Sequence, residues 1–267
     1  MIPALETLAP PPRRYRLTRV SSTQPKPITW LLPGRIPFGA LTIIAGRPGT
    51  GKSQFTLALA AQLSLAGVAS LLLGSEDGVG DTVHPRLLAA GADTDHVHVL
   101  DLDDDGLIQL PTDVPYISDA VKETGAGLLV LDPAQAHLAP EINSNVDASL
   151  RQATAPLARM AQETGIAVVL VTHLRKSTEG TALDRIGGSG GWGGAARSAL
   201  LFGKDRNADP WTDTRYLSHI KVNGAALAPA LECRVEGYDV RFGDMVIPSS
   251  RVVMEREVTD IYPSDIE

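Results

Sequence analysis

The chain has 267 residues, 43% of them hydrophobic, and a formal net charge of −7. This composition suffices for one principal domain with a sizeable core. It excludes an overall basic surface, so any contact with nucleic acid would come from a local patch or a partner subunit. The single cysteine, Cys233, excludes an internal disulfide. No apolar run approaches the length of a membrane span and no signal-peptide pattern is evident, so we expect a cytoplasmic protein with no membrane partner.

Strands and helices are expected to alternate over much of the chain. Residues 1–27 are rich in proline and arginine, which predicts an extended N-terminal arm. Apolar runs predict strands at residues 41–45, 69–74, 97–102, 128–132, 167–172 and 198–202. Helical spacing of apolar residues predicts helices at residues 52–66, 82–90, 114–123 and 146–164. This alternation predicts an α/β fold, with a mainly parallel sheet and helices on both faces.

The C-terminal third has a different pattern. Residues 215–222, 230–235 and 251–256 follow one another with turn signals and without helical spacing. They predict an antiparallel extension at the edge of the sheet. We expect one domain over residues 28–257, followed by a tail of residues 258–267.

Residues 46–53 form a phosphate-binding loop of the Walker A form, G-x-x-x-x-G-K-[ST], between an expected strand and an expected helix. Glycines leave the backbone N–H groups open to phosphate, and the helix N-terminus favours negative charge. Lys52 would reach the β- and γ-phosphates, and Ser53 would ligate Mg²⁺. The motif predicts binding of ATP or GTP, with ATP favoured, rather than a glycine-rich surface turn. The expected nucleotide contacts are Gly46, Arg47, Pro48, Gly49, Thr50, Gly51, Lys52, Ser53 and Gln54.

Two carboxylates are candidates for the rest of the site. Asp132 ends the apolar run 128–132, where an aspartate holds Mg²⁺ in many nucleotidases, although an aspartate also commonly starts a turn. The next residue is Pro133, so the water-activating glutamate that often follows this aspartate is absent there. Glu76 follows the run 69–74 at the same carboxyl edge of the sheet. We expect Glu76 to orient and deprotonate the attacking water; the alternative is a solvated loop acid or helix cap.

His173 follows the expected strand 167–172 at the same edge. It could hydrogen-bond the γ-phosphate and transmit its presence to the next loop, or it could be a structural histidine at a strand end. The segment 174–194 is rich in glycine and carries basic residues and one aromatic residue. These residue types suit the backbone and stacked bases of single-stranded DNA, while a lid or subunit contact is the alternative. The candidate nucleic-acid contacts are Arg175, Lys176, Arg185 and Trp192.

In this order the motifs resemble those of the RecA-like P-loop ATPases, most closely the compact hexameric replicative helicases and AAA_25-type ATPases of plasmids, phages and integrated elements. The resemblance covers about residues 28–240. It rests on segments 46–53, 75–77 with 83–87, 131–133, 171–173, and 188–190 leading to 195–197. It implies a RecA-like core, ATP and Mg²⁺ as cofactors, a homo-oligomer with a hexamer favoured, and His173 as the γ-phosphate sensor.

The resemblance also implies contacts between subunits and with DNA. Residues 134–145 fall where the family has its first DNA loop, and residues 174–190 where it has the second. A basic residue on a later strand would enter the neighbouring subunit's nucleotide site; Lys221 is the first choice, with Arg197 and Arg206 as rivals. The chain departs from the family because the first loop has almost no positive charge, and because no primase-binding or helix-turn-helix domain is visible.

These expectations favour an ATP-hydrolysing enzyme, a ring-forming DNA helicase or single-stranded-DNA-dependent motor in replication, recombination or repair of a mobile element. Lys52 and Mg²⁺ would neutralise the phosphates, Glu76 would activate water, and the neighbour's Lys221 or Arg197 would stabilise the transition state. Its partners would be single-stranded DNA and replication or recombination proteins. The alternative is a nucleotide-dependent switch or assembly ATPase that acts on a protein partner without moving on DNA. A small-molecule kinase, the third hypothesis, would need an acceptor pocket and lid arginines.

Overall fold

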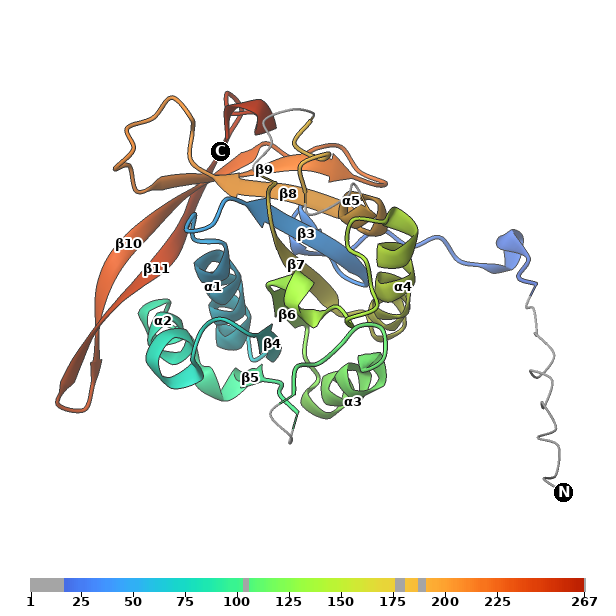
Figure 1. Ribbon diagram of the computed structural model, residues 1–267, viewed down its shortest axis with the longest axis horizontal. Coiled ribbons are helices and arrows are strands. Elements are labelled where there is room, and N and C mark those ends of the chain that lie inside the picture. Colours follow the sequence, from blue (N-terminus) through green and yellow to red (C-terminus); the bar gives the residue numbers. More distant parts are fainter. Residues whose placement is uncertain (1–16, 103–105, 176–180, 187–190, 267) are drawn as a thin grey trace, which may run out of the picture.

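A computed structural model describes residues 17–102, 106–175, 181–186 and 191–266. In these residues a nine-stranded sheet has the order β11-β10-β9-β8-β3-β7-β6-β4-β5 (Figure 1). The parallel strands are β3 (Ala40–Gly46), β4 (Ser70–Gly74), β5 (Val97–Val99), β6 (Leu128–Asp132), β7 (Ala167–His173) and β8 (Ser198–Gly203). The antiparallel strands at one edge are β9 (Thr214–Val222), β10 (Ala230–Phe242) and β11 (Met245–Val258).

Helices cover both faces of the parallel strands (Figure 1). The helices are α1 (Lys52–Leu65), α2 (His84–Ala89), α3 (Val114–Thr124), α4 (Asp147–Thr164) and α5 (Gly191–Ala195). One core cluster joins the sheet to α1 and α2, and the other joins it to α3, α4 and α5. Strands buried on both faces are apolar along their whole length, as in the run Val168–Val171, which is 0% exposed. The predicted α/β fold with a mainly parallel sheet and an antiparallel extension is confirmed.

The element boundaries agree with the predictions in the parallel half and differ elsewhere. β6 has the predicted bounds, and α3 and α4 end beside Gly125 and Gly165, whose left-handed φ values of +66° and +79° terminate helices well. β5 is shorter than predicted. The predicted start of α2 is instead a π-helical turn, η2 (Val79–Val83). A small hairpin of β1 (Trp30–Leu32) and β2 (Ile36–Pro37) was not predicted.

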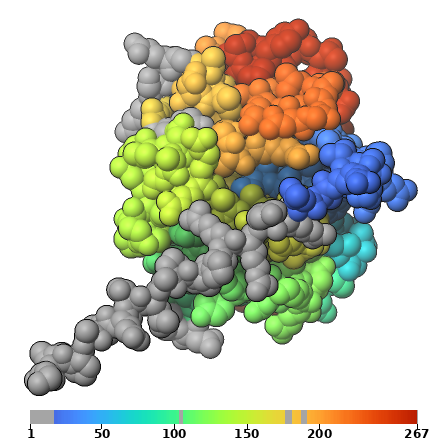
Figure 2. All heavy atoms as spheres, turned by 90° about the vertical axis from the view of Figure 1, so that its right-hand side faces the viewer, coloured from blue at the N-terminus to red at the C-terminus, as the bar shows by residue number. Residues whose placement is uncertain are grey.

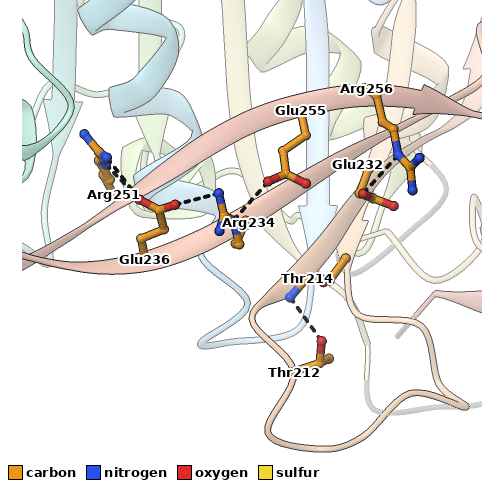
Figure 3. Close-up of polar contacts among 8 residues, drawn as sticks. All are labelled: Thr212, Thr214, Glu232, Arg234, Glu236, Arg251, Glu255 and Arg256. Carbon is orange, nitrogen blue, oxygen red and sulfur yellow. Dashed lines mark hydrogen bonds and ion pairs between the residues drawn. The ribbon is translucent and has the colours of Figure 1, made fainter.

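The hairpin of β10 and β11 is much longer than the predicted strands, and its tip projects past α2 (Figure 1). Cross-strand pairing continues from Ala230↔Val258 to Phe242↔Met245, although glycine, aspartate and proline residues weaken the strand pattern in the sequence. Charged side chains on its surface form ion pairs, three of them across the two strands and one along β10 (Figure 3). The ion pairs are Arg251–Glu236, Arg234–Glu236, Arg234–Glu255 and Arg256–Glu232, at 2.8–3.3 Å.

The two ends of the described chain differ in their contacts. Residues 17–27 are exposed, and the first of them (blue) extend away from the sheet and helices in Figure 1, so that they face the viewer in Figure 2. At the other end Ile266 is buried, it bridges Asp205, and Arg206 N donates to Asp265 O at 2.8 Å. No helix among the described residues combines the length and apolarity needed to cross a lipid bilayer.

Candidate nucleotide-binding site

The phosphate-binding loop connects β3 to α1 at the carboxyl edge of the sheet. Gly49 and Gly51 have φ values of +76° and +95°, which a side chain would strain. Gly46 is required for a different reason, because a Cβ atom there would collide with the carbonyl oxygen of Phe202 in β8. Thr50 Oγ1 donates to Arg47 O at 3.0 Å and closes the loop on itself. The loop is therefore shaped by both its own glycines and the neighbouring strand.

Lys52 lies at the start of α1 with its ammonium group held by the loop. Its Nζ donates to Gly46 O at 3.1 Å and to Arg47 O at 2.8 Å. Burial lowers the pKa of Lys52 to about 8, and the negative charges of Asp132 and Glu76 oppose this shift. A bound nucleotide phosphate would place a further negative charge beside Lys52 and would therefore stabilise its ammonium form.

Asp132 and Ser53 come together from two different elements. Asp132 ends β6 beside Gly74 of β4, and its carboxylate accepts a hydrogen bond from the Ser53 hydroxyl at the start of α1. Burial raises the pKa of Asp132, while Ser53 and Lys52 oppose the rise. No group of three or more His, Cys, Asp or Glu side chains in the described residues could hold a metal. One carboxylate and one hydroxyl nevertheless fit Mg²⁺, which takes few protein ligands and keeps phosphate and water oxygens.

Glu76 lies just beyond β4 on the rim of the same pocket. The pocket has a volume of about 510 Å³. Its walls include residues of the phosphate-binding loop with Glu76, Asp77, Arg86, Asp132, His173 and Val235. Glu76 is exposed there, and Arg86 Nη1 donates to the carboxylate of the adjacent Asp77 at 2.6 Å. The exposed position of Glu76 leaves its carboxylate accessible to water.

His173 ends β7 and pairs with Gly46 in the sheet. Its Nδ1 atom lies 3.4 Å from Lys52 Nζ. Burial lowers the pKa of His173, and the positive charge of Lys52 lowers it further. The ring is therefore neutral at neutral pH, so it can accept a hydrogen bond from Lys52 and donate one from its other nitrogen.

The predicted residues of the phosphate site thus share one pocket. Lys52, Ser53, Glu76, Asp132 and His173 all line it, although they come from four loops or strand ends. Gln54 also lines it and donates to Ser250 Oγ in β11. The catalytic and metal-binding roles of these residues remain predictions.

Trp192 contradicts the prediction that it stacks on a DNA base. It lies in α5, is 0% exposed, and belongs to the core cluster under α4. The many neighbouring glycines suggested a loose loop, but the large apolar ring gains more from burial than from solvent exposure. In the folded protein neither face of the Trp192 ring is accessible to a DNA base.

The other predicted nucleic-acid contacts have different outcomes. Arg175 is exposed and Arg185 is half-buried, and they lie side by side because Arg175 N donates to Arg185 O at 2.8 Å. Lys176 lies outside the described residues. Arg175 and Arg185 therefore remain candidates for a small basic patch after β7.

The candidate fingers do not line the pocket of their own chain. Lys221 pairs with Ala199 near the amino end of β8, the sheet edge opposite the phosphate-binding loop. Its Nζ donates to Gly193 O at 2.8 Å and Ala196 O at 3.0 Å, and burial lowers its pKa. Arg197, in contrast, is exposed at the same edge, and Arg206 is exposed after β8. Arg197 is thus more accessible to a neighbour than Lys221.

Sequence reasoning missed two arginines near the loop. Arg86 reaches the pocket from α2, and Arg215 in β9 donates from Nε to Thr50 O at 3.1 Å. Arg86 lies in segment 83–87, which contributes to the family resemblance but carries no predicted role, and Arg215 lies in no recognisable motif. The contact between Arg215 and Thr50 spans 165 positions, so no local pattern could have revealed it.

Known proteins share both the sequence pattern and the fold. The family model described as "AAA domain" (AAA_25) matches residues 9–179. The chain belongs to this family. Solved structures with this fold include an ATPase domain and a DnaB-like replicative helicase, so the family and the fold both support the RecA-like P-loop class predicted from the motifs.

The similar proteins include several with names connected with DNA. The DNA repair protein RadA of Halalkalibacterium halodurans is 32% identical over 58% of this chain, and that of Bacillus subtilis is 32% identical over 55%. The chain spans only 32% and 30% of these relatives. Among solved structures, one ATPase domain has a TM-score of 0.55, with 17% identity over 72% of this chain and 80% of that one. A DnaB-like replicative helicase studied with primase has a TM-score of 0.60, with 16% identity over 80% and 63% of the two chains.

Proposed function

We propose that this chain hydrolyses ATP between the subunits of a ring and couples hydrolysis to single-stranded DNA. The observation that carries the proposal is the composition of the pocket. Lys52, Ser53, Asp132 and Glu76 supply groups for phosphate, metal and water. The one arginine among the described pocket residues, Arg86, is already ion-paired with Asp77. A further cation for the transition state would therefore come from a neighbouring subunit.

Each side chain has a separate task in this proposal. Lys52 leaves the carbonyl oxygens of Gly46 and Arg47 to bind the phosphates, and Ser53 and Asp132 hold Mg²⁺, which would neutralise the phosphate charge when bound. Glu76 orients the attacking water and accepts its proton. His173, neutral beside Lys52, donates a hydrogen bond toward the terminal phosphate.

The basic patch of Arg175 and Arg185 is the proposed DNA contact. Arg175 closely follows His173 in the chain and contacts Arg185 through its backbone N–H, so a movement of this histidine would reach the patch through Arg175. The names of the similar proteins, DNA repair protein and replicative helicase, support a role in DNA replication, recombination or repair. A hexamer, a mobile-element setting and a replication or recombination partner follow only from the family resemblance.

The first test measures steady-state ATP hydrolysis with and without single-stranded DNA at low salt, with the mass of the assembly recorded. We expect an oligomer whose turnover rises with DNA, and a smaller rise in Arg175→Ala/Arg185→Ala. Arg256→Gln is the matched control, because it removes an exposed arginine of β11. A protein that stays monomeric with ATP bound would contradict the ring. A turnover that does not change when DNA is added would contradict the coupling to DNA.

A mixing experiment tests catalysis between subunits. Arg197→Ala and Glu76→Gln should each lose most of the turnover, since a trans-acting arginine is commonly worth about 10³-fold or more. In a mixture, some interfaces pair an intact Glu76 with a neighbour's intact Arg197, so part of the activity should return. If Arg197→Ala keeps its turnover, while Lys221→Ala loses it and is complemented by Glu76→Gln, Lys221 is the finger instead.

The alternative function is a nucleotide-dependent switch that acts on a protein. The buried position of Trp192 favours it, because the predicted stacking surface is absent. Residues 134–145 also carry only one formal charge, that of Glu141. Slow hydrolysis that ignores DNA in an intact oligomer would support this function.

A further inference from the structure

Arg215 is a buried cation outside the nucleotide pocket that contacts the phosphate-binding loop. It lies at the start of β9 and is 8% exposed. Its Nε donates to Thr50 O at 3.1 Å, and its Nη1 donates to Thr212 O at 2.8 Å and Thr214 O at 2.9 Å. The guanidinium group therefore joins the phosphate-binding loop to residues 204–213, the loop between β8 and β9.

Within the described residues no carboxylate forms an ion pair with Arg215 at up to 4.0 Å. Burial of this cation is unfavourable; the negative charge of the neighbouring Asp213 opposes that cost without forming an ion pair, and the hydrogen-bond partners are neutral carbonyl groups. Arginine is suited to this position because its fixed fork of donors can hold several carbonyl groups at once. A fold that only needed to fill this space could use an apolar side chain, so the three carbonyl contacts indicate a positioning role.

The contact with Thr50 fixes the orientation of the peptide group between Thr50 and Gly51. In a trans peptide the C=O and the following N–H point in opposite directions. When Arg215 holds Thr50 O on the side of β9, the N–H of Gly51 points the other way, toward the pocket that Gly51 lines. This N–H is one of the amides expected to bind phosphate. The reverse orientation would turn a carbonyl oxygen toward the phosphates and repel them.

Gly51 makes this orientation easy to lose. It has a φ of +95° and no side chain, so the peptide between Thr50 and Gly51 can rotate at little steric cost. Thr50 Oγ1 is bonded to Arg47 O and fixes only its own side chain. Among the described contacts, the hydrogen bond from Arg215 is the one that holds the Thr50 carbonyl.

We propose that Arg215 is a positioning residue that aims the Gly51 N–H at the nucleotide phosphates and couples this peptide to residues 204–213. The coupled loop carries Trp211, which is 90% exposed, and its end is pinned to β10 because Val235 N donates to Asp213 O at 2.9 Å. Figure 3 shows the end of the loop, where Thr214 N donates to Thr212 Oγ1. This inference rests on the proposed function in one respect: the pocket must bind a nucleotide.

The test compares Arg215→Gln and Arg215→Lys with the wild type, and uses Arg256→Gln as the control. Affinities for ADP and a nonhydrolysable ATP analogue are measured by calorimetry, and the melting temperature is recorded without nucleotide. Arg215→Gln should weaken both affinities about tenfold or more, and raise KM for ATP with little change in kcat, because a charged donor to the loop is lost. Arg215→Lys keeps one donor and should recover part of the affinity. Unchanged affinity in folded Arg215→Gln overturns the proposal.

Hydrogen exchange on the wild-type protein tests the coupling without any variant. ADP should slow amide exchange in residues 204–213 as well as in the phosphate-binding loop. If ADP protects only the phosphate-binding loop, the coupling is refuted. Failure of the wild type to bind ADP would refute the proposed function as well, whereas binding and hydrolysis with no effect of Arg215 would refute this inference alone.

Discussion

The parallel half of the sheet, β3 to β8, and the antiparallel half, β9 to β11, differ in how their residues serve the candidate site. In the parallel half Asp132 and His173 end apolar strands, Glu76 follows one by two residues, and Lys52 begins the helix after the phosphate-binding loop. The antiparallel half contributes contacts from a distance, such as Arg215 to Thr50. The comparison suggests that the parallel half carries the chemistry and the antiparallel half adjusts its geometry.

The largest expected effect is on ATP turnover, and it distinguishes a carboxylate in the parallel half from one in the antiparallel half. Glu76→Gln should lower ATP turnover about 10²–10⁴-fold, because the amide cannot accept the proton of the attacking water. Glu232→Gln, in β10, should leave turnover unchanged. Steady-state hydrolysis and ADP affinity would be measured for both, and ADP affinity should be preserved. If Glu76→Gln turns over like the wild type, the base lies elsewhere in the pocket.

Two tryptophans provide the next test. Trp192→Ala should lower the free energy of unfolding by about 3–5 kcal/mol, because it empties a fully buried site under α4. Trp211→Ala, on the exposed loop of the antiparallel half, should change it by about 0.5 kcal/mol or less. Denaturant unfolding of both variants measures the difference. Equal stabilities would place Trp192 outside the core and reopen the prediction that it stacks on DNA.

The pKa of Lys52 predicts how nucleotide affinity depends on pH. Bound phosphate stabilises the ammonium form, so the pKa of Lys52 is higher in the complex than the value of about 8 in the free protein. Below this pH the free protein is already protonated, and the contribution of Lys52 to affinity is constant. Above it, binding takes up a proton, so affinity for ADP should fall by up to about tenfold per pH unit. Calorimetry in buffers of different ionisation enthalpy should detect this uptake, and its absence at alkaline pH would show that Lys52 has an ordinary pKa.

The same contrast explains how much of the molecule could be predicted. Strands such as β6 and β7 are buried on both faces, so their continuous apolar runs mark them, and the polar residue that ends each run marks the site edge. The burial of Trp192 could not be predicted, because its glycine-rich surroundings give no sign of the helix above it. The contact between Arg215 and Thr50 and the full length of the β10–β11 hairpin depend on pairing between distant segments, for which local patterns carry no signal.

The smallest expected effect concerns the ion pairs on this hairpin. Arg234 contacts both Glu236 and Glu255, at 2.8 and 2.9 Å, but its side chain is 50% exposed. Solvent screens such pairs, so Arg234→Gln should lower the free energy of unfolding by about 1 kcal/mol or less, and the loss should shrink at high salt. Denaturant unfolding at low and high salt measures both values. A loss well above 1 kcal/mol that still shrinks at high salt would mean that the ion pairs, in addition to the packing of Cys233 and Val252 against the core, hold the hairpin in place. The antiparallel half would then reach the nucleotide site through its charges, and Arg251→Gln, which also breaks a pair with Glu236, should disturb nucleotide affinity as Arg215→Gln does.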